Sequence, residues 1–222
     1  LDIALIFCYN IIMKIKKEIE LALEKANIQL TNTNTDGRIN SSIDEPTIIK
    51  ILKAHFGARL KEASARKWWD LLIDDTPCNV KITNGGTDNA GNYLMLRHCF
   101  GEEDETLLNK TANKTKDMEA LLPFFENYKN DTLEDSGKSY YFIVIFKDTK
   151  EVLVRNLRCI TEVKQNPSNL PFQIYWNGER QAEENSSRTI KECWKDFIIN
   201  PLHAVNRTFE VKMHNQLKEW IK

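Results

Sequence analysis

The chain has 222 residues, a mass of 25.9 kDa and a formal net charge of -1, with 31 lysine and arginine residues against 32 acidic ones. This length fits one large domain, or one domain with a small appendage. A hydrophobic content of 41% with 28% charged residues is ordinary for a soluble globular protein. The balance of charge excludes a strongly basic nucleic-acid binder. It does not exclude local phosphate binding, which depends on where the charges lie.

The five cysteines are scattered, odd in number and without a CxxC pair: Cys8, Cys78, Cys99, Cys159 and Cys193. Such spacing is typical neither of a disulfide framework nor of a zinc site. The cysteines therefore predict a reducing, cytoplasmic setting.

Residues 1–12, LDIALIFCYNII, are apolar and precede an amphipathic stretch that opens at Met13. They lack the basic start and the small-residue end of a signal peptide, and they are too short to span a bilayer. We expect translation to begin naturally at Met13, with residues 1–12 a non-native or disordered extension and residues 13–222 a single domain. The alternative is an ordinary buried first strand or helix.

Periodicity predicts a helix from Met13 to about Ile28, followed by a polar loop over residues 29–42. Asp44-Glu45-Pro46 has the acids and the early proline that are typical of a helix start. The second predicted helix runs from there to Lys67, and Gly57 is the point at which it bends or divides.

A β-hairpin is predicted next. The strand over residues 68–73 is a short apolar run with one acid, DDTP is the turn, and residues 79–83 alternate between polar and apolar side chains. The segments 91–100 and 104–128 are predicted to be mainly helical.

The second half of the chain predicts three further strands and a helical tail. YYFIVIF over 140–146 has the composition of a buried strand, with 151–154 as its partner. A turn over 166–169 precedes a strand in LPFQIYW, and the tail from residue 187 is helical with a break at Pro201. The whole order indicates an α/β fold with a mixed central β-sheet flanked by helices.

Three polar residues of the hairpin can converge on one small volume. Asn79 and Lys81 are two apart on one strand and share a face, and Asp70 lies on the neighbouring strand about 4.8 Å away. Phosphodiester hydrolysis needs such a group. Carboxylates hold a hard divalent cation, and an ammonium orients the attacking water and stabilises negative charge.

The spacing of Asp70, eight residues, then Asn79-Val80-Lys81 resembles the PD-x(n)-(D/E)-x-K signature of PD-(D/E)XK nucleases, which include type II restriction endonucleases. The resemblance implies a restriction-endonuclease-like core and a Mg²⁺ cofactor. It also implies that Asp70 and the Val80 carbonyl are metal ligands, and that Lys81 orients the water. Glu45 is the best-placed match for a glutamate that many members carry on the preceding helix.

Two residues depart from the signature. Trp69 replaces a proline that has no chemical role. Asn79 replaces an acid, so a neutral carbonyl oxygen stands where a carboxylate is expected, and metal affinity should fall unless Glu45, Asp74 or Asp75 compensates. An engineered acid-to-Asn change that traps an uncleaved complex would have the same sequence.

Two polar segments are candidates for reading DNA, because Asn and Gln pair with adenine and Arg pairs with guanine. The alternative for the first is a plain turn, and for the second it is structural or solvent-facing side chains. The proposed DNA-binding residues are Thr83, Asn84, Asp88 and Asn89 in the first segment, and Asn169, Gln173, Asn177, Arg180 and Arg188 in the second.

The basic run from Lys50 to Lys67 is interpreted either as a phosphate-contacting surface or as a solvated helix face. The five tryptophans are assigned to core packing. Dispersed histidines disfavour histidine–metal nuclease chemistry, and the absence of a P-loop, G-x-S-x-G and G-x-G-x-x-G removes other common enzyme classes.

The sequence therefore predicts a type II restriction endonuclease that hydrolyses double-stranded DNA and leaves 5′-phosphate and 3′-hydroxyl ends. Cutting two strands related by a dyad favours a homodimer. A cognate DNA methyltransferase is expected as a system partner without a stable complex, and no membrane is involved. The rivals are a structure-selective or repair nuclease of the same fold, a catalytically inactive DNA-binding module because of Asn79, and an incidental motif.

Overall fold

The computed structural model describes residues 3–31, 37–64, 67–89, 95, 98–99, 126, 129–132, 136–164, 173–183 and 188–199. The chain divides into two compact units that alternate along the sequence. The first unit consists of residues 1–85 and 139–157, and the second of residues 86–138 and 158–222. From the sequence, residues 13–222 were predicted to form one domain. Two compact units do not test this prediction, because such units can still fold as one domain.

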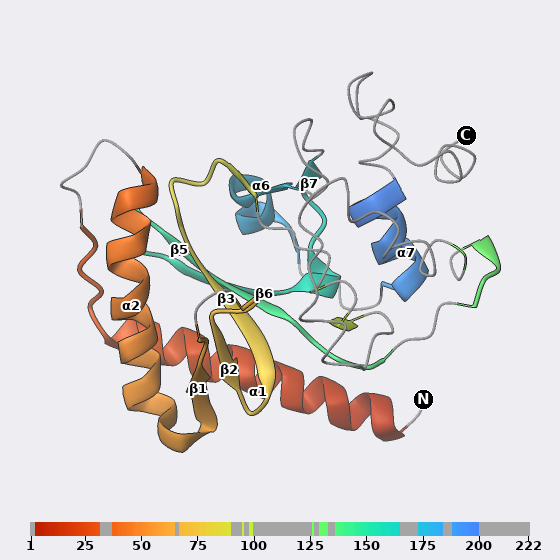
Figure 1. The fold of residues 1–222 in the computed structure, drawn as a ribbon, viewed down its shortest axis with the longest axis horizontal. Coiled ribbons are helices and arrows are strands. Elements are labelled where there is room, and N and C mark those ends of the chain that lie inside the picture. Colours follow the sequence, from red (N-terminus) through yellow and green to blue (C-terminus); the bar gives the residue numbers. More distant parts are fainter. Residues whose placement is uncertain are drawn as a thin grey trace. The chain divides into compact units, whose positions relative to one another are not determined.

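The first unit is built on a five-stranded mixed sheet with the order β1-β2-β3-β5-β6 (Figure 1). β1, β2 and β3 form an antiparallel meander, β3 and β5 are parallel, and β5 and β6 are antiparallel. The sheet therefore confirms the predicted mixed α/β class. The strands are β1 (Leu60–Glu62), β2 (Leu71–Ile73), β3 (Thr76–Thr83), β5 (Tyr141–Phe146) and β6 (Val152–Asn156).

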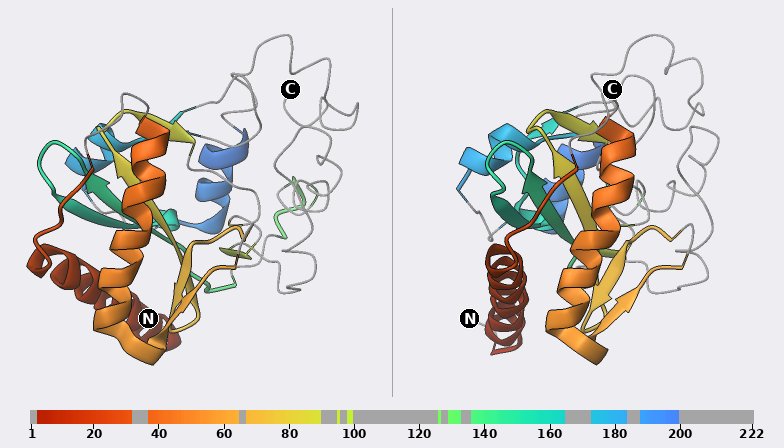
Figure 2. Two further views of the ribbon diagram at one scale, coloured as in Figure 1. Left: turned by 60° about the vertical axis from the view of Figure 1, so that its left-hand side comes forward. Right: turned by 90° about the vertical axis from the view of Figure 1, so that its left-hand side faces the viewer.

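Two long helices, α1 (Ile3–Lys25) and α2 (Gly37–Phe56), pack on one face of this sheet (Figures 1 and 2). α1 contacts β6, whereas α2 contacts β1 and β3. Their buried side chains join those of every strand in one hydrophobic cluster. Representative members are Ile19, Leu23, Ile48, Leu52, Leu71, Val80, Ile143 and Val154.

β5 is an interior strand of the sheet, between β3 and β6, and all six of its residues are buried. Tyr141, Ile143 and Ile145 belong to the cluster under the helices, while Phe142, Val144 and Phe146 are buried on the opposite face. The prediction that this apolar run is a buried strand is confirmed. The predicted antiparallel partner is confirmed as β6, which pairs Ile143 with Val154.

The β2–β3 hairpin turns at Asp74 and Asp75, and Thr76-Pro77 of the predicted DDTP turn already belong to β3. Both aspartates have positive φ, 49° and 62°, as a two-residue hairpin turn of the primed type requires. Arg59 holds the Asp74 carboxylate at 2.5 Å, and Lys61 holds Asp75 at 2.7 Å. These ion pairs tie the turn to the segment before it.

The second predicted helix was wrong at both ends. α2 begins at Gly37 and carries Pro46 in its interior, and it ends at Phe56 instead of Lys67. Gly57 has a φ of +57°, a left-handed conformation that ends helices readily only in glycine. A short 3-10 turn, η1 (Gly57–Arg59), then leads into β1, which the sequence did not predict.

The second unit has an antiparallel three-stranded sheet of order β4-β8-β7 in its described part. The predicted strand in LPFQIYW is shorter than expected, since Trp176 already begins a helix. Of the five tryptophans predicted to lie in the core, Trp176 and Trp194 are fully buried, Trp68 and Trp69 are only half-buried, and Trp220 lies outside the described residues. The elements are β4 (Thr87–Asn89), η3 (Leu157–Cys159), β7 (Val163–Lys164), β8 (Gln173–Tyr175), α6 (Trp176–Gln181), α7 (Ile190–Trp194) and the π-helical turn η4 (Lys195–Ile199).

Several sequence predictions concern residues outside or at the margin of the described part. The helices over 91–100 and 104–128, the turn over 166–169 and the break at Pro201 lie wholly or mostly outside it. Residues 3–12 form the first turns of α1, while a natural start at Met13 stays a prediction. No helix within the described ranges is long and apolar enough to cross a membrane.

Pro46 offers a test of where α2 begins. In the interior of the helix it removes the hydrogen bond to the carbonyl four residues earlier and strains the backbone. Replacing this exposed residue, Pro46→Ala, should therefore raise the free energy of unfolding by about 1 to 3 kcal/mol, measured by urea denaturation.

Thr47→Ala, at the next exposed position, is the control and should change stability by a few tenths of a kcal/mol. A neutral or destabilising effect of Pro46→Ala would contradict the long helix. It would instead support a start at Asp44, where a proline in the first turn is favourable.

Candidate active site

Asp70 lies immediately before β2 and is fixed by hydrogen bonds on both sides. Its N–H donates to the carbonyl of Cys78 on β3 at 2.9 Å, and its carbonyl accepts from the N–H of Ala63, just beyond β1, at 2.9 Å. Its carboxylate Oδ2 accepts from the backbone N–H of Val80 at 2.7 Å. The acid is therefore held against β3 at the middle of the Asn79-Val80-Lys81 sequence.

β3 presents Asn79 and Lys81 on the face opposite to the helices. Cys78, Val80 and Ile82 are buried in the hydrophobic cluster, and strand alternation places the two polar residues on the other side. Both are half-buried. The alternation predicted from the sequence is confirmed, and it explains how one strand serves the core and the candidate site.

Glu45, on α2, lies close enough to Asp70 and Lys81 for their charges to shift its pKa. Burial raises the pKa of Glu45 above its ordinary value of 4.5, the charge of Asp70 raises it further, and Lys81 lowers it. The pKa of Asp70 is also raised, first by burial, against the opposing effects of the Val80 N–H and Lys81. These effects on pKa indicate that the three ionisable residues proposed from the sequence lie near enough to influence one another, although they come from three separate segments.

The electrostatics of this group favour a cation. The carboxylates of Glu45 and Asp70 are half-buried and lie within electrostatic reach of the Lys81 ammonium. When all three side chains are ionised, their net charge is negative and partly shielded from water. The side-chain oxygen Oδ1 of Asn79 is buried and has no hydrogen-bond partner among the described residues. Burying such an oxygen without a hydrogen bond destabilises the fold, and coordination to a hard metal ion would offset that cost.

The donor set therefore fits a magnesium-type ion. Asp70 and Glu45 would supply carboxylate oxygens, and Asn79 an amide oxygen. The described residues contain no cluster of three or more His, Cys, Asp or Glu side chains that would hold a metal alone. A site of two carboxylates and a neutral oxygen suits Mg²⁺, which keeps several waters.

The first polar segment proposed for DNA binding begins at the end of β3. Thr83 is buried, and its Oγ1 accepts from the N–H of Gly85 at 3.1 Å, whereas Asn84 is exposed. Asp88 and Asn89 lie in β4 of the second unit. Asn89 pairs directly with Gln173 of β8, so the structure places two residues from the two predicted DNA-reading segments on adjacent strands.

The remaining residues of the second segment have mixed surroundings. Asn177 and Arg180 are half-buried in α6, and Asn169 lies outside the described residues. The guanidinium of Arg188 is only 8% exposed and is bound to Asp196 and to the carbonyl of Ile160. Arg188 therefore has a structural role within the second unit in this conformation.

The basic residues between Lys50 and Lys67 differ in position: some pair with acids of the hairpin turn, and others lie on α2. Arg59 and Lys61 are committed to the acids of the hairpin turn, whereas Lys50 and Lys53 lie on the exposed side of α2 beyond Glu45. Glu62, which pairs with Lys53, was missed because the sequence placed it in a helix. The only available signal was Gly57, which separates α2 from β1.

Stability should depend on pH in opposite directions at two aspartates. A raised carboxyl pKa means that the folded state binds the proton more tightly. Asp70 therefore costs stability as pH rises above its ordinary value of 3.8. The free energy of unfolding of Asp70→Asn should match the parent at lower pH and exceed it increasingly above that value, by urea denaturation across pH 3 to 8.

Asp74→Asn is the control of opposite sign. Arg59 lowers the pKa of Asp74, so the carboxylate stabilises the fold above pH 3.8 and loses this effect as pH falls through its lowered value. Because the pair is exposed, the loss at pH 7 should be less than about 1 kcal/mol. A pH-independent difference for Asp70→Asn would contradict a buried, destabilising charge.

Comparison with known proteins does not identify a function for this group of residues. Comparison with family models, with curated proteins and with solved structures found no match to the chain. The groups of the site that decide its chemistry are two carboxylates of raised pKa, a buried amide oxygen without a hydrogen-bond partner among the described residues, and an ammonium.

Proposed function

We propose that the protein is a Mg²⁺-dependent nuclease of the PD-(D/E)XK type that hydrolyses double-stranded DNA at a specific site, as type II restriction endonucleases do. The observation that supports this proposal is the electrostatic influence of Asp70 and Lys81 on the pKa of Glu45, and of Lys81 on the pKa of Asp70. Asp70 and Asn79-Val80-Lys81 resemble the family signature, many family members carry a glutamate on the preceding helix, and Glu45 of α2 matches that position.

The chain's own groups have distinct parts in the reaction. Asp70 and Glu45 would hold the cation with Asn79 and the Val80 carbonyl, and a bound Mg²⁺ would polarise the phosphate and lower the pKa of the attacking water. The Val80 N–H keeps the Asp70 carboxylate oriented. Lys81 donates hydrogen bonds from Nζ, which orients the attacking water and offsets the negative charge that develops on the phosphate.

Site specificity would come from polar side chains of the second unit. Asn89 and Gln173 on paired strands support the idea that the two predicted DNA-reading segments act as one surface. A homodimer would place two such sites on the two strands of a duplex. A cognate methyltransferase would protect the host sequence without a stable complex. A structure-selective nuclease of the same fold would cut without a defined sequence.

Asn79 favours a second candidate function, a DNA-binding module without catalysis. An amide oxygen in place of a carboxylate leaves one fewer negative charge to hold the cation. In that case the chain would bind DNA in the presence of Mg²⁺ and leave it intact.

Cation binding can be measured without any reaction. Because Mg²⁺ would bind the folded chain, a concentration ten times its Kd should raise stability by about 1.4 kcal/mol and increase Tm. Asp70→Asn should lose most of this increase, while Asp148→Asn, an exposed acid of the β5–β6 turn, should keep it. An equal Mg²⁺ response in all three proteins would contradict the proposed site.

Cleavage tests the catalytic roles. With unmethylated phage DNA and Mg²⁺ the chain should give discrete bands, and Lys81→Ala should reduce the rate by about 100-fold or more. Lys17→Ala removes an exposed lysine of α1 and should leave the rate unchanged.

Asn79→Asp separates the two candidate functions. Bands that appear only in this variant would show that position 79 disables an otherwise competent site. A smear in place of bands would favour the structure-selective nuclease. Absence of both cleavage and DNA binding in every variant would refute the nuclease proposal.

A further inference from the structure

A groove of about 410 Å³ lies between α2 and β1 of the first unit. Its lining consists of Pro46, Ile49, Lys50 and Lys53 from the helix and Glu62 from the strand. One wall is therefore a single helix face, since residues three and four apart lie on the same side of a helix. Ile49 is half-buried and the other four lining residues are exposed, so the groove is open to solvent.

Both walls of the groove begin next to the candidate active site. On the helix, Pro46 directly follows Glu45. On the strand, Glu62 is paired with Leu71, which directly follows Asp70. A backbone hydrogen bond from the Ala63 N–H to the Asp70 carbonyl also joins the end of β1 to the residue before β2. A polyanion held through the proposed cation at Glu45 and Asp70 would therefore have a path of approach or exit along this groove.

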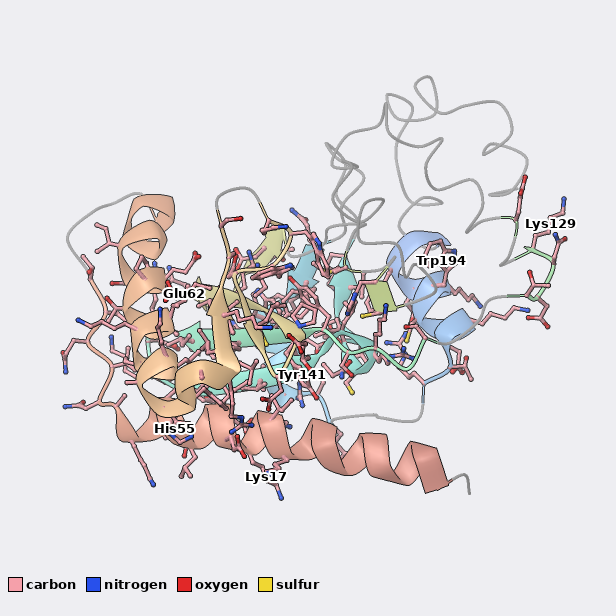
Figure 3. The ribbon with its side chains drawn as sticks, turned by 60° about the horizontal axis from the view of Figure 1, so that its bottom comes forward. Lys17, His55, Glu62, Lys129, Tyr141 and Trp194 are labelled. Atoms are coloured by element: carbon pink, nitrogen blue, oxygen red, sulfur yellow. The ribbon has the colours of Figure 1, made fainter. Side chains whose placement is uncertain are left out.

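The groove carries two lysines with different surroundings. Lys50 is exposed and has no ion-pair partner among the described residues. Lys53 is paired with Glu62, and both side chains are about half exposed. Figure 3 shows Glu62 between α2 and the strands, and Lys17 projecting from α1 away from the sheet. The pair is weak enough to exchange, since exposed ion pairs contribute little.

The spacing of the lysines along α2 suits a nucleic-acid strand. At 1.5 Å per residue, Lys50 lies about 7.5 Å and Lys53 about 12 Å beyond Glu45 along the helix axis. A DNA strand carries one phosphate per about 3.4 Å of duplex axis. Both lysines would therefore reach phosphates two to four nucleotides away from a phosphate that is held through the proposed cation at Glu45.

We propose that this groove binds the sugar–phosphate backbone of the DNA strand adjacent to the phosphate that is cut, through Lys50 and Lys53. The inference rests on the proposed function and adds a substrate-binding surface to it. Lysine binds phosphate as a point charge and carries no base preference, so the groove contributes affinity independent of sequence. Glu62 competes with phosphate for Lys53 and limits that affinity.

The test is DNA binding by the full chain carrying Asp70→Asn, which leaves DNA uncut. Fluorescence anisotropy with a labelled 30-base-pair duplex gives Kd between 50 and 200 mM KCl. Lys50→Ala and Lys53→Ala should each raise Kd about three-fold or more, and each should reduce the slope of log Kd against log salt by about 0.9. Glu62→Gln should lower Kd.

Lys17→Ala is the matched control, because it removes the same charge from an exposed position on the other helix. It should leave the salt slope unchanged. Circular dichroism confirms folding of each variant. If the groove variants behave like Lys17→Ala while the parent chain cuts DNA, the groove is wrong and the proposed function stands. If the parent chain neither cuts nor binds DNA, the proposed function fails and the groove fails with it.

Discussion

The hydrogen bond from the Val80 N–H to the Asp70 carboxylate is the contact on which the proposed chemistry depends. It fastens an acid from the start of β2 to the middle of β3, where Asn79 and Lys81 point away from the core. The backbone of Asp70 is fixed by β3 and by the segment after β1. Two backbone hydrogen bonds fix the main chain of Asp70 and a third fixes its carboxylate, so this side chain loses little further entropy on binding a cation.

This arrangement costs stability, and the cost points to function. Asp70 and Glu45 are partly buried near each other, and Lys81 offsets only part of their charge. A protein that needed only a stable hairpin would do better with neutral residues at both positions, since burial penalises ionised groups. The buried oxygen of Asn79 has no hydrogen-bond partner in the part of the chain that the structure describes, which adds to this cost. Perturbed acids that cluster in this way are characteristic of functional sites, although structural networks also produce them.

Local patterns predicted the strands of the site, but not the way they are assembled. Alternation around Val80 and the apolar run of β5 were sufficient to identify both strands. Their parallel pairing was not predictable, because about sixty residues separate them and no local signal encodes the register. β1 was missed because Leu60-Lys61-Glu62 fits an amphipathic helix as well as a strand. Only the left-handed φ of Gly57, which a sequence does not show, decides between them.

The nearly neutral net charge becomes compatible with DNA binding once the positions of the charges are known. Arg59 contacts Glu18 and Asp74, and Lys61 contacts Asp75, so much of the basic run is neutralised within the fold. Lys50 has no ion-pair partner among the described residues, and it lines the groove that begins beside Glu45. Electrostatic attraction of a polyanion depends on the local field over about a Debye length, roughly 8 Å in physiological salt. Within that distance, the proposed cation and Lys50 would dominate the proposed interaction, whereas the total charge of the chain would have little effect.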